Sequence, residues 1–313
     1  MNSRKVKSVN RRLALLGWIG SVAALCACED APAPSAPTAA LAGAAGKLPR
    51  SPSVSEEAAR QRAEAVEKSL NPQGLVAYSG PVGGVRGLVS VSGDAPPLLQ
   101  EIAAKIPEDC PRALEMQRKL YRQGVNRSLA DVLVTVTEYT GYIRPRSDAV
   151  RVEAKGCAFD ANLTAMVYGQ HLEVFNRDGQ AYMPRLIGVP SYALRVAMPG
   201  GGPVPIFPPN PGRYLLVDET RDYMRSELFV LNYPTFAVTG LDGAFEINGV
   251  PAGDAKVTAY SPALGKVSEQ RVKIQAGVIQ DLKFELAFSQ AEYDAALRAK
   301  PAEPAKAADS AKK

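Results

Sequence analysis

The sequence predicts an all-β protein of the β-sandwich type, with short helices on the N-terminal side, and leaves open whether its strands form one sandwich or two. Between residues 75 and 288, short runs with apolar side chains recur at turn-bounded intervals of about ten residues, as a β-sandwich requires. The run TFAVTGLDGAFEINGV predicts a hairpin, because alternating apolar residues flank a Leu-Asp-Gly turn. No segment repeats at a period typical of a solenoid.

The first 27 residues have the features of an export signal. Basic residues precede the apolar run LALLGWIGSVAAL, which is too short to span a bilayer comfortably as a mature helix. The segment LCAC that follows resembles the end of a bacterial lipoprotein signal. The resemblance implies a signal peptide at residues 1–27 and a lipid on Cys28, with an ordinary secretory signal cut near Ala27 as the alternative. A lipid would attach the mature protein to a membrane of the cell envelope, facing the periplasm or exposed at the surface.

Removal of residues 1–27 changes the charge of the chain. The formal net charge is +5, and this segment holds five basic side chains and no acidic one, so +5 minus 5 leaves about zero. We therefore expect no nucleic-acid partner. The single histidine of the chain also excludes zinc fingers and His-rich metal sites.

The cysteines predict one disulfide. Cys26 leaves with the signal and Cys28 is the lipid site, so Cys110 and Cys157 remain in an exported, oxidising compartment. A bond between them would close a loop of roughly 48 residues, worth about 4 kcal/mol on the chain-entropy estimate. The alternative is a pair of free buried thiols.

Three segments outside the predicted sandwiches have distinct compositions. Residues 28–52 are rich in Ala and Pro with almost no large apolar side chain, so a disordered tether is expected. Residues 53–72 predict a short helix with a narrow apolar face, which indicates weak docking or a spacer. Residues 289–313 predict an Ala/Lys-rich tail that is solvated or helical.

The elements of the body follow one another in a regular order. The first predicted strand places Val85, Val89 and Val91 on one face. A helix-like segment follows, and Pro107 and Pro111 break it into two short helices. Four further strands are predicted in the runs LADVLVTVTEY, AVRVEAKGCAF, LTAMVYGQ and HLEVFNRD.

Five motifs occur in an order shared with known proteins. They are GCAF at 156–159, YGQHLEVFNRD at 168–178, RVAMPGGGPVPIF at 195–207, RYLLVDETRDYM at 213–224 and YPTFAVTGLDGAFEINGVPAG at 233–253. The first four resemble the cupredoxin-like (plastocyanin-like) periplasmic proteins related to methylamine-utilisation components. The fifth resembles the carboxypeptidase regulatory-like β-domain. The resemblance implies a cupredoxin-like Greek-key β-sandwich at residues 75–230, then a regulatory-like (transthyretin/Ig-like) β-sandwich at residues 231–288.

The resemblance also places the copper ligands of that family on this chain. Its two histidines, its cysteine and its methionine fall on Tyr182, Arg221, Asp218 and Met224. A blue-copper site needs a thiolate and two imidazoles, with methionine as the weak axial ligand, and only that methionine is retained. We therefore expect neither copper nor another cofactor here. Asp218 and Arg221 are expected to pair, and Tyr182 to hydrogen-bond to either; a merely solvated acidic turn is the alternative.

No sequence motif points to catalysis. The chain has no Gly-x-Ser-x-Gly elbow, no phosphate-binding loop and no HExxH. We expect a non-catalytic cell-envelope lipoprotein that acts as a scaffold or binding module for an envelope protein or a glycan. One alternative is a metal-binding or redox protein with an unusual site near Met224.

A carbohydrate- or peptidoglycan-binding module is the other alternative. Exposed tyrosines could supply a stacking surface for sugars, although tyrosine in sandwich strands is more often packed. The candidates are Tyr139, Tyr142, Tyr168, Tyr214, Tyr223 and Tyr233.

Overall fold

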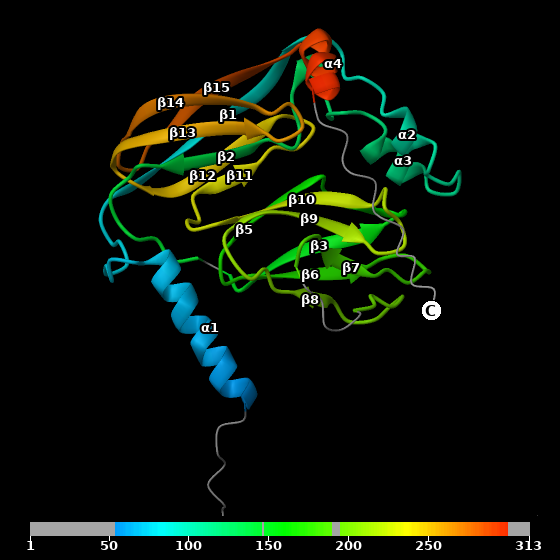
Figure 1. The fold of residues 1–313 in the computed structure, drawn as a ribbon. Helices are drawn as coiled ribbons and strands as arrows, with labels where there is room; N and C mark the ends of the chain where they lie inside the picture. The colour runs from blue at the N-terminus through cyan, green and yellow to red at the C-terminus, as the bar shows by residue number, and fades with distance from the viewer. Residues whose placement is uncertain (1–53, 146, 190–194, 300–313) are drawn as a thin grey trace, which may run out of the picture. The chain divides into compact units, whose positions relative to one another are not determined.

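The computed structural model describes residues 54–145, 147–189 and 195–299. The predicted signal peptide, the lipid site Cys28, the tether and the end of the tail lie outside these residues. Within them, most of the secondary structure is β-strand, in four sheets that face one another in pairs (Figure 1). The predicted all-β class is confirmed.

One pair of sheets, here named the host sandwich, contains the first two and the last five strands. Its sheets have the strand orders β12, β1, β15 and β11, β2, β13, β14. Val85, Val89 and Val91 of β1 are buried in its apolar core, as their period-two spacing predicts. The strands are β1 (Val82–Gly93), β2 (Leu133–Thr137), β11 (Phe236–Val238), β12 (Ala244–Pro251), β13 (Gly253–Ser261), β14 (Lys266–Ile274) and β15 (Ile279–Phe288).

The other pair of sheets, here named the inserted sandwich, contains the eight strands between β2 and β11. Its sheets have the strand orders β4, β3, β6, β8 and β5, β10, β9, β7. Phe159, Met166 and Leu228 are among the side chains of its separate core. The strands are β3 (Ala149–Lys155), β4 (Ala158–Phe159), β5 (Leu163–Val167), β6 (His171–Asn176), β7 (Pro184–Leu186), β8 (Val204–Ile206), β9 (Gly212–Asp218) and β10 (Arg225–Leu231).

Strand pairing corrects the predicted boundary between residues 75–230 and 231–288. Strand β1 runs parallel to β15 and antiparallel to β12, and β2 lies between β11 and β13. The first two strands therefore belong with the last five, and the chain inserts one sandwich into the other. The pattern along a strand shows which of its faces is buried but not which strands flank it, so this topology could not be predicted from the sequence.

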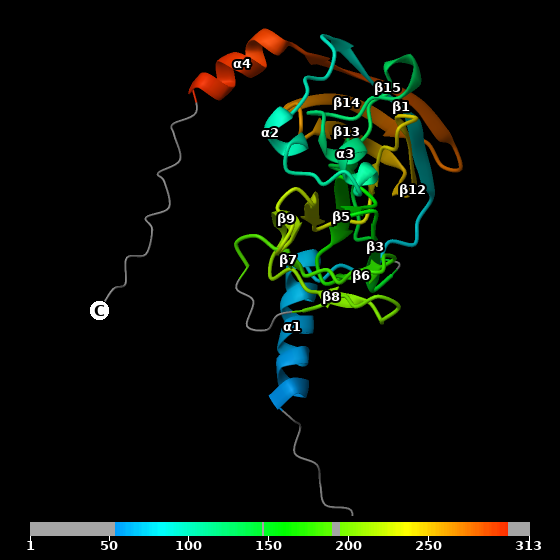
Figure 2. The same ribbon diagram turned by 90° about the vertical axis from the view of Figure 1, so that its right-hand side faces the viewer.

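Two short helices connect β1 to β2. They are α2 (Gln100–Ala103) and α3 (Pro111–Gln117), with a 3₁₀ turn at Val125–Arg127 further on. The two prolines separate the helices as predicted, and Cys110 is the residue that precedes α3. In Figure 2, which faces the right-hand side of Figure 1, both helices lie in front of the sheets.

Helix α1 (Val54–Leu70) docks on the inserted sandwich. Val66 and Leu70 pack against its core, and the Arg62 guanidinium lies 5.0 Å from the ring centroid of Phe207. Gly169 has a φ of +96°, and a Cβ there would lie 2.5 Å from a methyl of Val66, so only glycine allows this approach.

Helix α4 (Gln290–Ala299) follows β15 and packs Tyr293 against the host core. Among the described residues, no helix combines the length and the apolarity needed to cross a bilayer.

Candidate functional site

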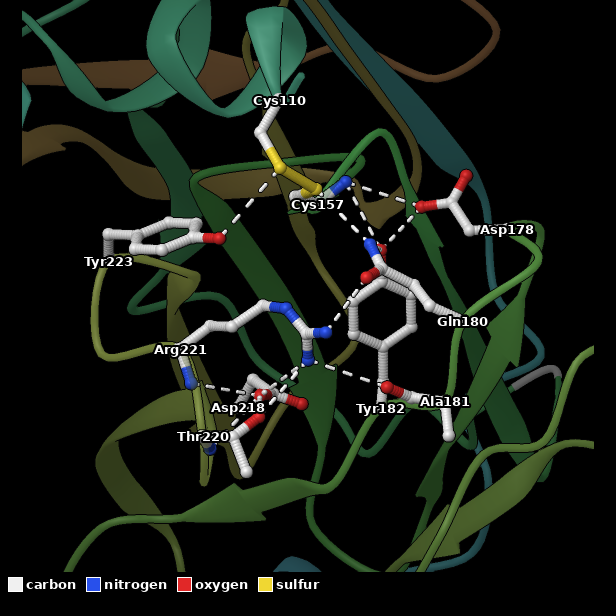
Figure 3. Close-up of a disulfide and its surroundings, with 10 residues drawn as sticks. All are labelled: Cys110, Cys157, Asp178, Gln180, Ala181, Tyr182, Asp218, Thr220, Arg221 and Tyr223. Atoms are coloured by element: carbon white, nitrogen blue, oxygen red, sulfur yellow. Dashed lines mark hydrogen bonds and ion pairs between the residues drawn. A yellow bond between two sulfur atoms is a disulfide. The ribbon is translucent and has the colours of Figure 1, made fainter. Parts of the chain in front are cut away.

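The loop between β9 and β10 brings three of the four predicted positions together. Asp218 ends β9 and Met224 precedes β10. The Asp218 amide donates to the Met224 carbonyl at 3.1 Å, and the Met224 amide donates to the Arg221 carbonyl at 2.8 Å. Tyr182 precedes β7, whose first residue, Pro184, lies opposite Asp218 in the antiparallel register. The fold thus brings all four positions together. Figure 3 shows three of them, Tyr182, Asp218 and Arg221, side by side.

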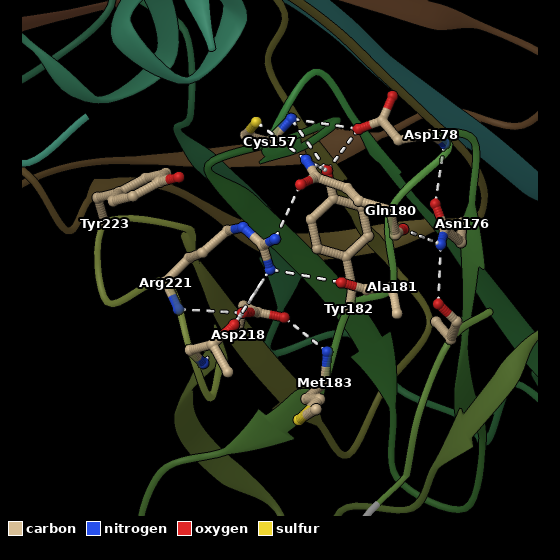
Figure 4. A network of polar contacts seen from close by, with 12 residues as sticks. Cys157, Asn176, Asp178, Gln180, Ala181, Tyr182, Met183, Asp218, Arg221 and Tyr223 are labelled. Carbon is tan, nitrogen blue, oxygen red and sulfur yellow. Dashed lines mark hydrogen bonds and ion pairs between the residues drawn. The ribbon is translucent and has the colours of Figure 1, made fainter. Parts of the chain in front are cut away.

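The Asp218 carboxylate is buried and fully occupied by protein donors. Its side chain is 0% exposed. Oδ2 accepts the Met183 amide at 2.6 Å, and Oδ1 accepts the amides of Thr220 and Arg221, both at 3.0 Å, and the Thr220 hydroxyl at 2.7 Å. Hydrogen bonds from several amides are what a buried carboxylate needs in place of water. Asp218 therefore fastens its own loop to the chain that leads into β7 (Figure 4).

Arg221 places a cation in the middle of the site. Its Nη1 lies 3.4 Å from Oδ1 of Asp218, so the predicted ion pair is present. The guanidinium also donates to the Gln180 side-chain oxygen at 2.8 Å and to the Ala181 carbonyl at 3.4 Å. Its carbon lies 5.0 Å from the centroid of the Tyr182 ring, within the range of a cation–π contact.

Tyr182 turns its hydroxyl away from Asp218 and Arg221, so the predicted hydrogen bond to either is wrong. The hydroxyl donates to Oδ2 of Asp178 at 2.5 Å and accepts from the Gln180 side chain at 2.9 Å. It also accepts the Cys157 amide at 3.2 Å. Because Asp178 follows β6 in a turn only four residues away, it reaches the hydroxyl while Arg221 covers the ring.

Burial and hydrogen bonding shift two pKa values in opposite directions. Burial, followed by the hydrogen bond to Asp178, raises the pKa of Tyr182 to about 12. Burial alone would raise the pKa of Asp178, but the hydrogen bonds from the Gly156 amide and the Tyr182 hydroxyl outweigh it and hold that pKa below its usual value. The pair is therefore a neutral phenol that donates to a carboxylate at neutral pH.

The predicted disulfide between Cys110 and Cys157 is confirmed and lies beside this site. The bond is 2.02 Å long, with the two Cα atoms 5.5 Å apart. The Gln180 amide nitrogen lies 3.2 Å from Sγ of Cys157, and the Tyr223 hydroxyl lies 3.9 Å from Sγ of Cys110 (Figure 3). The disulfide thus links the start of α3 to the inserted sandwich where the four positions meet.

Sequence reasoning missed Asp178 and Gln180, which complete the group. We name Asp178, Gln180, Tyr182, Asp218 and Arg221 the polar cluster. The signal that could have found Asp178 and Gln180 is the Asn-x-Asp turn that opens at Asn176. Its side-chain oxygen accepts the Asp178 amide at 2.8 Å, and its side-chain nitrogen donates to the Gln180 carbonyl at 2.7 Å (Figure 4).

The polar cluster does not fit a copper ion. A phenol, a carboxylate and a guanidinium stand at the positions onto which the resemblance places imidazole, thiolate and imidazole. Both oxygens of Asp218 already accept hydrogen bonds, and Arg221 is a permanent cation within the site. Met224, which is fully buried, is the one residue of the four that has the type implied by the resemblance. Elsewhere in the described part of the chain, no three His, Cys, Asp or Glu side chains are grouped to hold a metal ion.

The other residues considered from the sequence are packed side chains. His171 is half-buried in β6, stacked on Phe207 with the ring centroids 4.9 Å apart. Tyr142, Tyr168 and Tyr223 are buried. The remaining three candidate tyrosines, Tyr139, Tyr214 and Tyr233, are half-buried. None of these six is an exposed platform for stacking a sugar.

Comparisons with known proteins give a distant likeness to copper proteins. No family model matches the chain, and no curated protein matches it. Amicyanin from Paracoccus versutus is 16% identical over 31% of this chain and 96% of its own, with a TM-score of 0.24. A copper-containing nitrite reductase from Thermus scotoductus is 20% identical over 31% of this chain and only 25% of its own, with a TM-score of 0.23. Likeness at this level establishes neither family nor activity.

Proposed function

We propose that this protein is a non-catalytic scaffold or binding module of the cell envelope, built on a cupredoxin-like sandwich that has lost its copper site. The polar cluster carries the proposal. Asp218 and Arg221 form an ion pair at two of the four ligand positions, and the ring of Tyr182 packs against the guanidinium. The same loops that would hold a metal are joined here by the protein's own hydrogen bonds.

The charges of the polar cluster oppose metal entry. A guanidinium stays protonated at any pH at which the protein is folded, so a divalent cation would have to displace it or bind beside it. Freeing Asp218 for coordination would leave the amides of Met183, Thr220 and Arg221 without their acceptor. Within the part of the chain that the structure describes, no set of ligands supports electron transfer through copper.

Two features of the chain support a location in the cell envelope. The lipoprotein-like signal with Cys28 indicates a membrane anchor. The Cys110–Cys157 disulfide is typical of a protein that folds in an oxidising compartment.

Metal content tests the proposal that this module binds no metal. The full chain is produced in medium supplemented with copper and zinc, and the metal per chain and the visible absorption spectrum are measured. We expect sub-stoichiometric metal and no intense visible band. Stoichiometric copper with such a band would overturn the proposal and favour the metal-binding or redox alternative.

The test of the anchor compares the wild type with Cys28→Ala in isolated membranes. We expect the wild-type N-terminal peptide to carry a lipid and the protein to sediment with membranes, and the variant to do neither. A wild-type N-terminus without lipid would show that an ordinary secretory signal is cut instead.

The scaffold role is separated from sugar binding by two measurements. Crosslinking in intact envelopes followed by purification should yield a protein that is recovered reproducibly, and a glycan array should show no binding. Saturable binding to peptidoglycan fragments with no crosslinked protein would replace the scaffold with a carbohydrate-binding module.

A further inference from the structure

A cavity of about 220 Å³ lies away from the polar cluster, between the two sandwiches and the segment that connects β1 to β2. The α2–α3 segment forms one wall, with Leu99 and Ile102. The start of β10 forms a second, and the turn between β13 and β14, with Ala263, forms a third. Figure 1 shows α2 and α3 close to the ends of β9 and β10. The cavity shares no residue with the polar cluster.

The size and the walls of the cavity suit a ring-sized apolar group. Apolar side chains of the α2–α3 segment and of the turn between β13 and β14 line it, together with Leu163 of β5 and Leu215 of β9. The start of β10 contributes only polar side chains. An apolar cavity of about 150 Å³ in another protein is large enough to hold benzene, so this one has room for a ring and a small charged group. Ligand sites of this kind combine apolar walls with a few placed polar groups.

The side chains that line the cavity carry more unpaired positive than unpaired negative charge. Its two carboxylates are each neutralised by a bidentate arginine outside the lining. Asp131 accepts from Arg122 at 2.7 and 2.6 Å, and Glu227 accepts from Arg213 at 2.8 and 2.7 Å. Bidentate pairs of this geometry satisfy both partners, which removes these carboxylates as counter-ions for anything else.

The two cations on the lining are not matched in this way. Arg225 donates to the neutral carbonyl of Asp222 at 3.1 and 2.6 Å, and among the described residues neither Arg225 nor Lys119 forms an ion pair with a carboxylate. Gln117 donates to the Arg225 carbonyl at 3.0 Å and so fixes the backbone of that residue. The cavity therefore pairs apolar walls with two unmatched positive charges.

We propose that this cavity binds a small organic anion: a carboxylate attached to a single ring or a body of similar size. Lys119 and Arg225 attract the carboxylate, and the apolar walls take up the ring. The Cys110–Cys157 disulfide holds the start of α3 in place, so the wall is formed before the ligand enters.

The test titrates the full chain with benzoate and with benzamide, its neutral counterpart, and follows the chemical shifts of backbone amides. We expect saturable binding of benzoate with a Kd on the order of 1 mM, and binding of benzamide weaker by about tenfold. Shifts should concentrate on residues of the three walls. No saturable benzoate binding, or equal binding of the two compounds, would overturn the proposal.

Three variants locate the binding. Lys119→Gln combined with Arg225→Gln should weaken benzoate binding by about tenfold or more, whereas Lys283→Gln, at an exposed lysine of β15, should leave it unchanged. Ala263→Phe should abolish the binding by filling the cavity without removing a charge. If the double variant does not fold, Lys119→Gln alone and Ala263→Phe decide the question, and unchanged affinity in both contradicts the site. Metal content is unaffected by any of these changes, so this test is separate from that of the metal-free module.

Discussion

The guanidinium carbon of Arg221 lies 5.0 Å from the centroid of the Tyr182 ring, although the two residues come from different loops. The contact joins the loop after β9 to the chain before β7. The amide of Met183, next to Tyr182, binds Asp218 from the same direction at 2.6 Å. An internal cation and an internal anion thus join these two loops through the protein's own contacts.

Removal of the Asp218 carboxylate should destabilise the fold strongly. Asp218→Ala leaves three backbone amides without their acceptor in a buried site, and we expect a loss of about 2–4 kcal/mol in the free energy of unfolding. Urea denaturation measures it. Asp222→Ala in the same loop is the matched control, because Asp222 pairs with Lys105 at 2.7 Å on the exposed surface, and it should cost less than about 1 kcal/mol. Equal losses would contradict the buried-anion role of Asp218.

Tyr182 should make stability depend on pH in the alkaline range. Its pKa is about 12 in the folded chain against an ordinary value of 10.0, so the folded state retains the proton longer. The stabilisation is therefore fully present below pH 10 and is lost as the pH rises toward 12. The free energy of unfolding of the wild type should fall toward that of Tyr182→Phe over this window.

The control for this pH dependence is Tyr78→Phe. The Tyr78 hydroxyl donates to the Pro81 carbonyl at 3.1 Å in an exposed setting. The same measurement on this variant gives the effect of removing an exposed tyrosine hydroxyl. A difference between the wild type and Tyr182→Phe that does not change with pH would show that the Tyr182 hydroxyl is not buried against Asp178.

Loss of the disulfide should lower stability by about 4 kcal/mol, because a sequence separation of 47 residues is no longer closed in the unfolded chain. Guanidinium denaturation of the wild type and of Cys110→Ser/Cys157→Ser measures the change. Limited proteolysis should cut the variant first between α2 and α3, since the bond anchors the start of α3. An unchanged denaturation midpoint would show that the network around Cys157 holds this segment without the bond.

Introducing the ligands that the resemblance implies should create a copper site. Tyr182→His, Asp218→Cys and Arg221→His together, with Met224 retained, would supply two imidazoles, a thiolate and an axial thioether. We expect one copper per chain and an intense visible band, whereas Arg221→His alone should show neither. A triple variant that keeps the far-ultraviolet circular dichroism of the wild type but binds no copper would show that the four positions are not equivalent to the copper ligands.

The sequence was a good guide where the physics is local. Period-two spacing located the buried face of β1, prolines separated α2 from α3, and the pairing of Cys110 with Cys157 followed from elimination. The convergence of Tyr182 and Arg221 came only from the family resemblance.

Interactions set by the folded shape were not predictable. The partners of β1 lie more than 150 residues away, and no local signal selects them. The hydroxyl of Tyr182 was expected at Asp218 or Arg221, but Asp178 takes it because the Asn176 turn brings that carboxylate closer. The cavity is formed by three segments that lie far apart in the sequence, so no sequence pattern predicted it.

The nesting of one sandwich inside the other dictates the order in which a chain emerging from its N-terminus can finish folding. All strands of the inserted sandwich are available once Leu231 has appeared, whereas β1, the central strand of its sheet, stays open on one edge until β15 arrives at Ile279. A nascent chain stopped between these two points would contain all the strands of the inserted sandwich, whereas β1 would still lack its partner β15. The host sandwich, whose first strands are synthesised first, is thus the last to be completed.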